Sequence, residues 1–527
     1  MTRTIQFLAI VALTAASAAA QSRGPALIDA VKAGDAAAAR RLIRGSDVNV
    51  PGVDGTTALH WAVNRDDVAM VDLLLKAGAK PSVANRYGVL PLSLAAQNGN
   101  ADIIERLLRA GADVSTKLPG GETALMTAAR TGSPEALKAL MAHGAKVDQV
   151  EETHGQSALM WAAANNNPDA IRVLVEGGAN IHATSADKDF RNIGDGPRGA
   201  KAKTEYLMTP LLFAVRNGHI EATRALLEKG ANVNDATVDG LSALIIAILN
   251  KHWELGSVLL QAGADPSWSK SGWTPLHQVA RTRNLNVGTL PQPVPTGRID
   301  SLELVKQLIA KGADVNAVMT EGMRGDGYRG TFNRIGATPF LLASKGVDPP
   351  LMRLLLAHGA NPYTANANGT TTLMAAAGVD INVQGEDGGN YDVAMEGVKI
   401  ILEQIHDDPA KINQANKKGE TALHGAAWRG SNPLVELLVA KGAKLDAKTP
   451  KGFMPIDFAA GRHSGGTLRE QPQTVALMRD MMIKRNLEFF DGREADEERR
   501  ARSAAGGAAQ LAEEEERRGR LLLSPPK

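Results

Sequence analysis

The stretch that comes closest to a chemical motif is Asp380-Ile-Asn382-Val-Gln384-Gly385. Its order of acid, amide and glycine is that of the first half of a calcium loop, in which oxygen atoms surround the ion. The twelfth position of such a loop needs a glutamate, and here it is Tyr391. No helix–loop–helix pattern flanks the stretch. We therefore predict no metal site in it.

Other catalytic signatures are missing from the sequence. There is no G-x-S-x-G, H-E-x-x-H or phosphate-loop pattern, and the carboxylates are scattered rather than paired. The chain contains no cysteine, which excludes disulfides, thiolate metal sites and a cysteine nucleophile. We predict that the protein is not an enzyme and has no catalytic residue, cofactor or metal.

The charges are balanced, with 59 basic and 57 acidic residues and a net charge of +2. A nucleic-acid-binding protein usually carries a clear excess of positive charge, so nucleic acid is not the expected partner.

The pattern of residues 1–20 predicts a secretory signal peptide. Arg3 precedes an apolar run from Ile5 to Leu13, and small residues end the segment at Ala20. We therefore expect an exported protein, periplasmic or secreted. No later apolar run is long enough to span a membrane.

One sequence pattern recurs along most of the chain. Its clearest copies contain TALHWAV, LPLSLAA, TALMTAA and SALMWAA, and each copy closes on a glycine. These glycines are Gly78, Gly111, Gly144 and Gly178, at steps of 33, 33 and 34 residues. A fixed period of this length is typical of a solenoid of stacked supersecondary units.

The local signals predict two helices in each unit. The first helix starts after a hydroxyl residue that can accept hydrogen bonds from the first turn, at Thr57, Thr123, Thr209, Thr274, Thr338 and Thr421. The second helix carries aliphatic residues at helical spacing, as in Val71, Leu74 and Leu75. The closing glycines suit the left-handed end of that helix.

The motifs TALH, TPLH, GADV and GANVN resemble those of the ankyrin repeat, and they recur about twelve times, caps included. The resemblance implies an all-α solenoid of stacked helix pairs, with β-turn fingers and a concave groove. It covers roughly Pro25 to Asn486, and we expect the solenoid over residues 21–490, with an N-cap at about 25–50 and a C-cap at about 452–490. The charged segment 491–527 is expected to be a disordered tail.

Five insertions break the period. Two enlarge fingers, at Asp187–Glu205 and Met319–Gly336. Three fall between the two helices of a unit, at Asn286–Arg298, Gly378–Tyr391 and His463–Gln473. The resemblance places these two groups at opposite edges of the stack, and we expect the enlarged fingers to carry function.

Several histidines match the family pattern. His60, His277 and His424 end the motifs TALH, TPLH and TALH. The resemblance implies that each bonds the Thr three residues earlier and braces the turn. His219 and His252 match an inter-helix histidine of the family, and the same structural role is expected of them.

Aromatic residues divide into two groups by repeat position. The resemblance places Trp61, Trp161 and Trp253 in the core, and Trp273 and Trp428 on the groove. Exposed aromatic residues are typical anchors of interfaces, because they bury much area at low entropic cost. The alternative is that they only pack between neighbouring fingers.

Arginines recur at comparable groove positions and in the enlarged fingers, which favours an acidic protein surface as the partner. The predicted partner-binding residues are Trp273, Trp428, Tyr87, Arg86, Arg130, Arg216, Arg281, Arg429, Arg191, Arg198, Arg324, Tyr328, Arg329 and Phe332.

The favoured hypothesis is an exported scaffold, monomeric by itself, that binds a protein partner through its groove and enlarged fingers. A second hypothesis is an accessory subunit of a periplasmic enzyme such as an oxidoreductase, with a site built from the inserted loops. A third is an immunity or chaperone-like protein that protects another exported protein. The identity of the partner does not follow from the sequence.

Overall fold

The computed structural model of the chain describes residues 25–186, 207–284, 293–321, 332–381, 391–462 and 470–489. Every regular element in these ranges is a helix, and extended pairing is limited to isolated bridges such as Lys117 with Thr123. The all-α prediction is confirmed for the described residues. The predicted signal peptide and the charged tail lie outside them.

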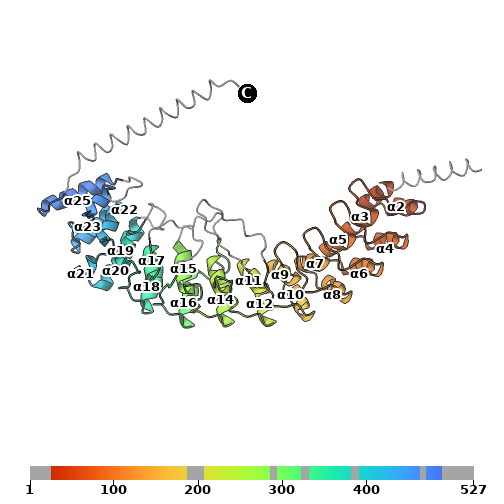
Figure 1. Cartoon of the computed structure of the whole chain (residues 1–527), viewed down its shortest axis with the longest axis horizontal. Helices are drawn as coiled ribbons and strands as arrows, with labels where there is room; N and C mark the ends of the chain where they lie inside the picture. Colours follow the sequence, from red (N-terminus) through yellow and green to blue (C-terminus); the bar gives the residue numbers. More distant parts are fainter. Residues whose placement is uncertain are drawn as a thin grey trace, which may run out of the picture. The chain divides into compact units, whose positions relative to one another are not determined.

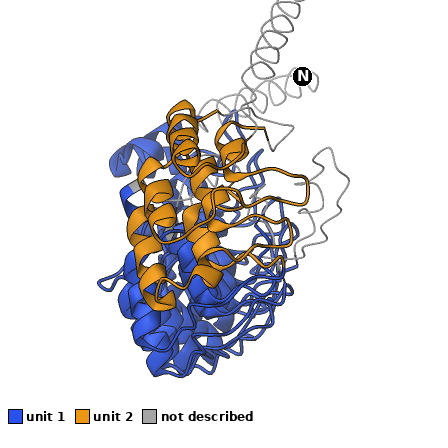
Figure 2. Cartoon of the chain, turned by 90° about the vertical axis from the view of Figure 1, so that its left-hand side faces the viewer, with its two compact units in different colours: residues 1–367, 385–393 blue, residues 368–384, 394–527 orange. Residues whose placement is uncertain are grey.

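The chain divides into two compact units (Figure 2). Unit 1 comprises residues 1–367 and 385–393, and unit 2 comprises residues 368–384 and 394–527. The repeat pattern runs through residue 367 and does not mark this division.

Unit 1 consists of helix pairs stacked in chain order. Its N-terminal pair is a helix over 25–33 followed by α2 (Ala36–Ile43). The first helices of the later pairs are α3 (Ala58–Asn64), α5 (Pro91–Asn98), α7 (Ala124–Thr131), α9 (Ala158–Ala164), α11 (Pro210–Arg216), α13 (Ala243–Leu249), α15 (Pro275–Asn284) and α17 (Pro339–Lys345). The second helices are α4 (Val68–Lys76), α6 (Ala101–Arg109), α8 (Pro134–Ala142), α10 (Pro168–Glu176), α12 (Ile220–Glu228), α14 (Trp253–Gln261), α16 (Ser301–Ala310) and α18 (Pro349–Ala357).

The helices of unit 1 form two rows (Figure 1). Each first helix from α3 to α17 contacts the next first helix, and the second helices from α4 to α12 do the same. This arrangement confirms the predicted solenoid of helix pairs.

Unit 2 continues the same plan. It contains α19 (Thr372–Ala377), α20 (Tyr391–Ile405, from Ala394 on), the single turn α21 (Pro409–Ile412), α22 (Ala422–Arg429), α23 (Asn432–Ala440), α24 (Pro455–Ala459) and α25 (Pro472–Lys484). Helices α19, α22 and α24 contact one another in sequence, and α23 contacts α25. The helices α24 and α25 fall in the segment expected to cap the C-terminal end.

The predicted helix starts are confirmed at all six threonines. Five of them are the N-cap residues of α3, α7, α11, α17 and α22, and the sixth precedes Pro275 at the start of α15. The hydroxyl of Thr209, for example, accepts a hydrogen bond from Leu212 N–H. These helix starts form because the cap satisfies an amide that has no partner inside the helix.

Small side chains let the first helices pack closely. Ala95, Ala128 and Ala162 are fully buried in consecutive first helices. In the second helices, aliphatic residues such as Ile104 and Leu107 are fully buried. The buried stripe predicted from helical spacing is therefore the core of the stack.

The closing glycine of a unit needs a left-handed backbone. Gly78 has φ +89°, which a residue with a Cβ rarely adopts. Its carbonyl accepts a hydrogen bond from the Asn49 side chain at 3.0 Å, and the Asn49 amide oxygen accepts from Lys80 N–H at 2.8 Å. One asparagine thus ties two successive units together.

The insertions lie in the expected connections, but most of their residues fall outside the described part of the chain. The described end of Asn286–Arg298 is attached to the preceding repeat. Thr296 N–H donates to the Lys251 carbonyl at 3.2 Å, and the Thr296 hydroxyl lies 2.8 Å from His252 Nδ1. Arg298 N–H donates to Glu254 Oε2 at 2.7 Å.

Candidate interaction surface

The fingers that precede the first helices are joined by backbone hydrogen bonds. Arg86 N–H donates to the Asp54 carbonyl of the previous finger at 2.9 Å. The same link joins Glu152 N–H to Gly120 at 2.9 Å and Ala367 N–H to Ile335 at 2.7 Å. Successive fingers therefore form a connected edge rather than independent loops. We call the tips of these turns, together with the bonds between them, the finger edge.

The finger edge of unit 1 exposes apolar side chains at its tips. Val53 is 89% exposed, Tyr87 71%, Val238 70% and Ile335 46%. Apolar groups on a rigid, solvent-facing edge gain free energy when a partner covers them, because their area leaves water. Val53 and Tyr87 lie on neighbouring fingers, and Val238 and Ile335 lie on fingers further along unit 1.

Two tryptophans of the first helices each have a cationic side chain of the preceding repeat over the indole ring. The Lys32 ammonium lies 4.7 Å from the centroid of the Trp61 ring, and the Arg130 guanidinium lies 5.1 Å from that of Trp161. Both tryptophans are half-buried, although the resemblance placed them in the core. The third residue of that group, Trp253, is buried as expected, at 5% exposure.

Four predicted anchors keep the exposure expected of them. Arg86, Tyr87, Arg130 and Arg216 are exposed. The Arg130 guanidinium also forms a 3.5 Å ion pair with Glu122, and that of Arg216 lies 5.2 Å from the Phe213 ring centroid. A role in binding stays a prediction for all four.

The prediction that the Trp273 side chain is exposed on the groove is wrong. Its side chain is only 6% exposed, and its indole N–H donates to Gln278 Oε1 at 3.1 Å. The Ser271 hydroxyl donates to its carbonyl at 3.1 Å. Burial of the indole costs little, because Gln278 in the first turn of α15 accepts a hydrogen bond from its one polar atom.

The two arginines Arg281 and Arg429 are also buried, at 8% and 6% exposure, although both were expected on the groove. Burial lowers the pKa of Arg281 to about 10. Arg429 Nε donates to the Ala377 carbonyl at 3.4 Å, across the close packing of α19 and α22. Neither side chain offers its charge to a partner in this arrangement.

Phe332 and Trp428 differ from the expectation in a similar way. Phe332 is 7% exposed, and the Lys345 ammonium lies 5.6 Å from its ring centroid. Trp428 is half-buried, and its indole N–H donates to the Ile381 carbonyl at 2.9 Å. The remaining predicted residues fall outside the described part of the chain; they are Arg191, Arg198, Arg324, Tyr328 and Arg329.

The histidines have the structural role that the resemblance implied. His277 Nδ1 accepts from Thr274 N–H at 3.1 Å, so the proton is on Nε2, which donates to the Ala337 carbonyl at 3.0 Å. His60 makes the same contacts with Thr57 and Val89. Burial holds the pKa of His277 down at about 4, which keeps the imidazole neutral. His60, His277 and His424 each join a helix start to the next finger. His219 and His252 instead contact the carbonyls of Ala164 and Arg216 in the preceding repeat, at 3.0 and 3.2 Å.

Asp380, the first residue of the calcium-like stretch, is part of an ion pair. Its Oδ1 lies 2.6 Å from Lys418 Nζ, and its Oδ2 accepts from the Thr370 hydroxyl at 3.0 Å. Residues 382–390 lie outside the described ranges. Among the described residues, no group of three or more His, Asp or Glu is placed to hold a metal ion.

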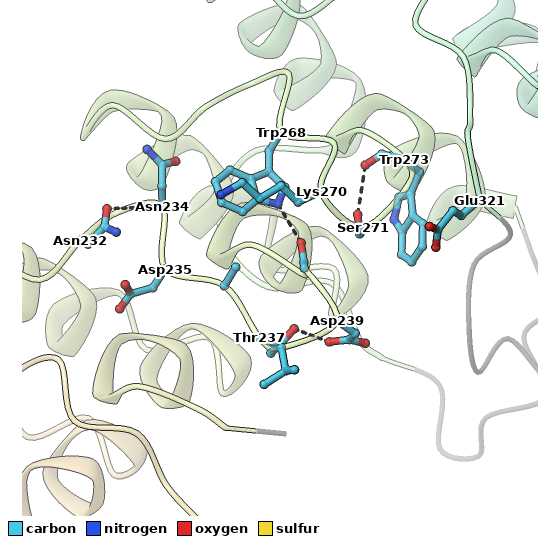
Figure 3. Close-up of a pocket in the computed structure, with 13 residues that line it drawn as sticks. Asn232, Asn234, Asp235, Thr237, Asp239, Trp268, Lys270, Ser271, Trp273 and Glu321 are labelled. Carbon is cyan, nitrogen blue, oxygen red and sulfur yellow. Dashed lines mark hydrogen bonds between the residues drawn. The ribbon is translucent and has the colours of Figure 1, made fainter. Parts of the chain in front are cut away.

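A hollow lies between two consecutive fingers of unit 1, and sequence reasoning did not find it (Figure 3). It has a volume of about 640 Å³ and is lined by residues 235–240 of one finger and by Trp268, Lys270 and Trp273 of the next. Glu321 lies on its far side. We call it the finger hollow. The sequence signal that could have indicated it was Trp268, an aromatic residue inside a turn.

The comparisons with known proteins agree with this architecture. The family model described as ankyrin repeats (3 copies) matches residues 27–118, 113–185, 195–268 and 211–290. A model for ankyrin repeats (many copies) matches 159–227, and the single ankyrin repeat matches 271–319 and 418–450. The chain belongs to the ankyrin-repeat family.

Curated relatives share the repeats over part of their length. Human ankyrin repeat and SOCS box protein 16 is 28% identical over 253 residues, which is 47% of this chain and 47% of that protein. Putative palmitoyltransferase ZDHHC13 of Danio rerio is 29% identical over 51% of this chain and 35% of its own length. A putative ankyrin repeat protein of Rickettsia felis is 36% identical over 21% of this chain and 45% of its own length.

The matched part of this chain therefore spans less than half the length of each of these relatives. What they share with it is the repeat, which indicates a scaffold for protein–protein interaction. None of the helices in the described ranges has both the length and the apolar character needed to cross a membrane.

Proposed function

We propose that the chain is an exported scaffold that binds a protein partner along the finger edge and first helices of unit 1. The observation that carries this proposal is the row of exposed apolar tips formed by Val53, Tyr87, Val238 and Ile335. Backbone hydrogen bonds between fingers hold much of this edge in place before binding, which lowers the entropic cost of association.

The half-buried pairs of Lys32 with Trp61 and of Arg130 with Trp161 support the same surface. Each pair combines a partly exposed indole with a positive charge, and tryptophan and arginine are common at the energetic centre of interfaces. The basic bias expected of the groove is weaker than the sequence indicated, because Arg281 and Arg429 are buried. We therefore expect the partner to contribute apolar contacts as well as acidic ones.

Capture from an extract of the source organism, quantified by mass spectrometry, tests this surface. The variant carrying both Tyr87→Ala and Trp161→Ala should reduce the captured amount of the main partner about tenfold or more, since truncated aromatic anchors commonly cost 2 kcal/mol or more. Tyr363→Ala is the matched control, because Tyr363 is 49% exposed and lies in the connection after α18. Equal capture by both variants and the wild type would contradict the surface.

A deletion that tests the enlarged fingers has to leave the hydrogen bonds at their bases intact. Gly336 N–H donates to the Met319 carbonyl at 2.8 Å, and Thr320 N–H donates to that of Gly272 at 2.9 Å. Removal of Met319–Gly336 would therefore break the finger edge itself. Deletion of residues 187–206 and 322–331 leaves those bonds and should abolish capture without changing the unfolding temperature.

Export is proposed from the composition of residues 1–20. Sequencing of the mature N-terminus should find Gln21, and a chain that still begins at Met1 in the extracellular or periplasmic fraction would contradict it. A partner that is an enzyme of that compartment would favour the accessory or protective role over that of a general scaffold.

A further inference from the structure

At the finger hollow, two successive fingers are joined by a side-chain hydrogen bond instead of a backbone one such as that of Arg86 with Asp54. No backbone hydrogen bond joins finger 237–240 to finger 268–272, although both are fully described. The Trp268 indole N–H instead donates to the Gly240 carbonyl at 2.7 Å. A side chain therefore replaces the backbone link here, and the space beside that indole is the finger hollow (Figure 3).

Carboxylates outnumber cations on its wall. Asp235, Asp239 and Glu321 line the finger hollow, and among the described lining residues Lys270 is the one with a positive charge. Asp235 accepts from the Thr209 hydroxyl at 2.7 Å, and Asp239 from the Thr237 hydroxyl at 2.5 Å. A carboxylate has about four acceptor positions, so each can accept further hydrogen bonds.

The protein already places one cation against this wall. The Lys270 ammonium lies 4.7 Å from the centroid of the Trp268 ring. Lys270 is exposed at the surface, and a lysine side chain loses considerable rotamer freedom when it is held in one place. The Trp268 ring is therefore a cation-binding surface, and its present occupant can be displaced at little cost.

We propose that the finger hollow binds a cationic side chain, arginine or lysine, of the protein partner, and that Lys270 occupies this position until the partner displaces it. The proposal rests on the proposed function for the existence of that partner. A guanidinium suits the site best, because it can stack on an indole and donate to more than one carboxylate at once. The ligand is thus of opposite charge to the acidic partner surface expected from the groove arginines.

Fluorine NMR of the full chain labelled with 5-fluorotryptophan tests this directly. The chain has six tryptophans, and the Trp268→Phe variant assigns the Trp268 signal. The probes are the peptides acetyl-Gly-Arg-Gly-amide and acetyl-Gly-Glu-Gly-amide. We expect a saturable shift of the Trp268 signal with the arginine peptide and none with the glutamate peptide.

Charge variants give the decisive comparison. Asp239→Asn and Glu321→Gln should each weaken binding of the arginine peptide about two- to fivefold, and Lys270→Gln should tighten it by a similar factor, because a competing like charge is removed. Glu152→Gln, a substitution in a different finger, should leave binding unchanged.

A Trp268 signal that does not saturate, an equal response to both peptides, or weaker binding by Lys270→Gln would overturn the proposal. Unchanged signals from Trp61, Trp161, Trp253 and Trp428, which do not line the finger hollow, and an unchanged unfolding temperature show that each variant is folded. Because the probe is a peptide and not the partner, this result is independent of the capture experiment. Equal capture by the Tyr87→Ala/Trp161→Ala variant and the wild type, together with saturable binding of the arginine peptide, would overturn the proposed surface but not the finger hollow.

Discussion

At the scale of single residues, the histidines carry a pH dependence of stability. His277 is buried and neutral, with a pKa held at about 4 by burial. The unfolded chain has a histidine pKa near 6.5. Between these values the unfolded state binds a proton that the folded state does not. The contribution of His277 is therefore fully present above about pH 6.5 and is lost as the pH falls toward 4.

We predict that acid lowers the free energy of unfolding less in His277→Gln than in the wild type. Between pH 7 and pH 5 the difference should be about 2 kcal/mol, because each pKa unit corresponds to about 1.4 kcal/mol. Urea unfolding at the two pH values measures it. The exposed His182→Gln variant should keep the wild-type pH dependence, and an identical pH dependence in His277→Gln would contradict the assignment.

At the scale of elements, the packing of α19 against α22 depends on one glycine. A Cβ at Gly425 would lie 2.5 Å from Val379 N and 2.8 Å from Gly378 C. Both are backbone atoms, which cannot rotate away as a side chain can. The close approach of α19 and α22 in unit 2 therefore requires the absence of a side chain at this position.

Gly425→Ala should destabilise unit 2 by about 1–3 kcal/mol, the usual cost of overpacking. Hydrogen exchange should rise in α19 and α22 and stay unchanged in α3 and α5 of unit 1. Gly177→Ala provides the comparison, because its Cβ would meet the flexible Met141 side chain, with the sulfur at 2.5 Å. We expect a smaller effect there, and equal effects of the two substitutions would count against the backbone clash.

At the scale of the whole molecule, the stack is held by contacts between neighbouring repeats. Stability in such an array is close to a sum of repeat and neighbour terms, and cooperativity breaks down over long arrays. This chain divides into two compact units, and limited cooperativity would let each unit unfold at its own denaturant concentration (Figure 2).

We predict that the two units unfold at different urea concentrations. Hydrogen exchange followed by mass spectrometry across a urea series resolves them without any substitution. Peptides from α7 and from α22 should lose protection at separate midpoints. A single midpoint for both would show that the chain unfolds as one cooperative body.

Much of this architecture could be predicted from the sequence, because its signals are local. A threonine cap, a proline at the first helical position and a closing glycine act through their own turn of backbone. Thr209, Pro210 and Gly230 therefore occupy the positions expected of them. The bracing role of His277 was also predicted, because the resemblance to the ankyrin repeat implies a bond to Thr274, three residues earlier.

The tertiary structure alone decided which side chains are free to meet a partner. Trp273 and Arg281 occupy repeat positions that predict exposure, yet the neighbouring helices and fingers bury both. The finger hollow likewise depends on Trp268, Asp239 and Glu321 from three different connections. Exposure and charge complementarity are sums over groups far apart in sequence, so a periodic pattern determines the fold of each repeat but not the surface that the stack presents.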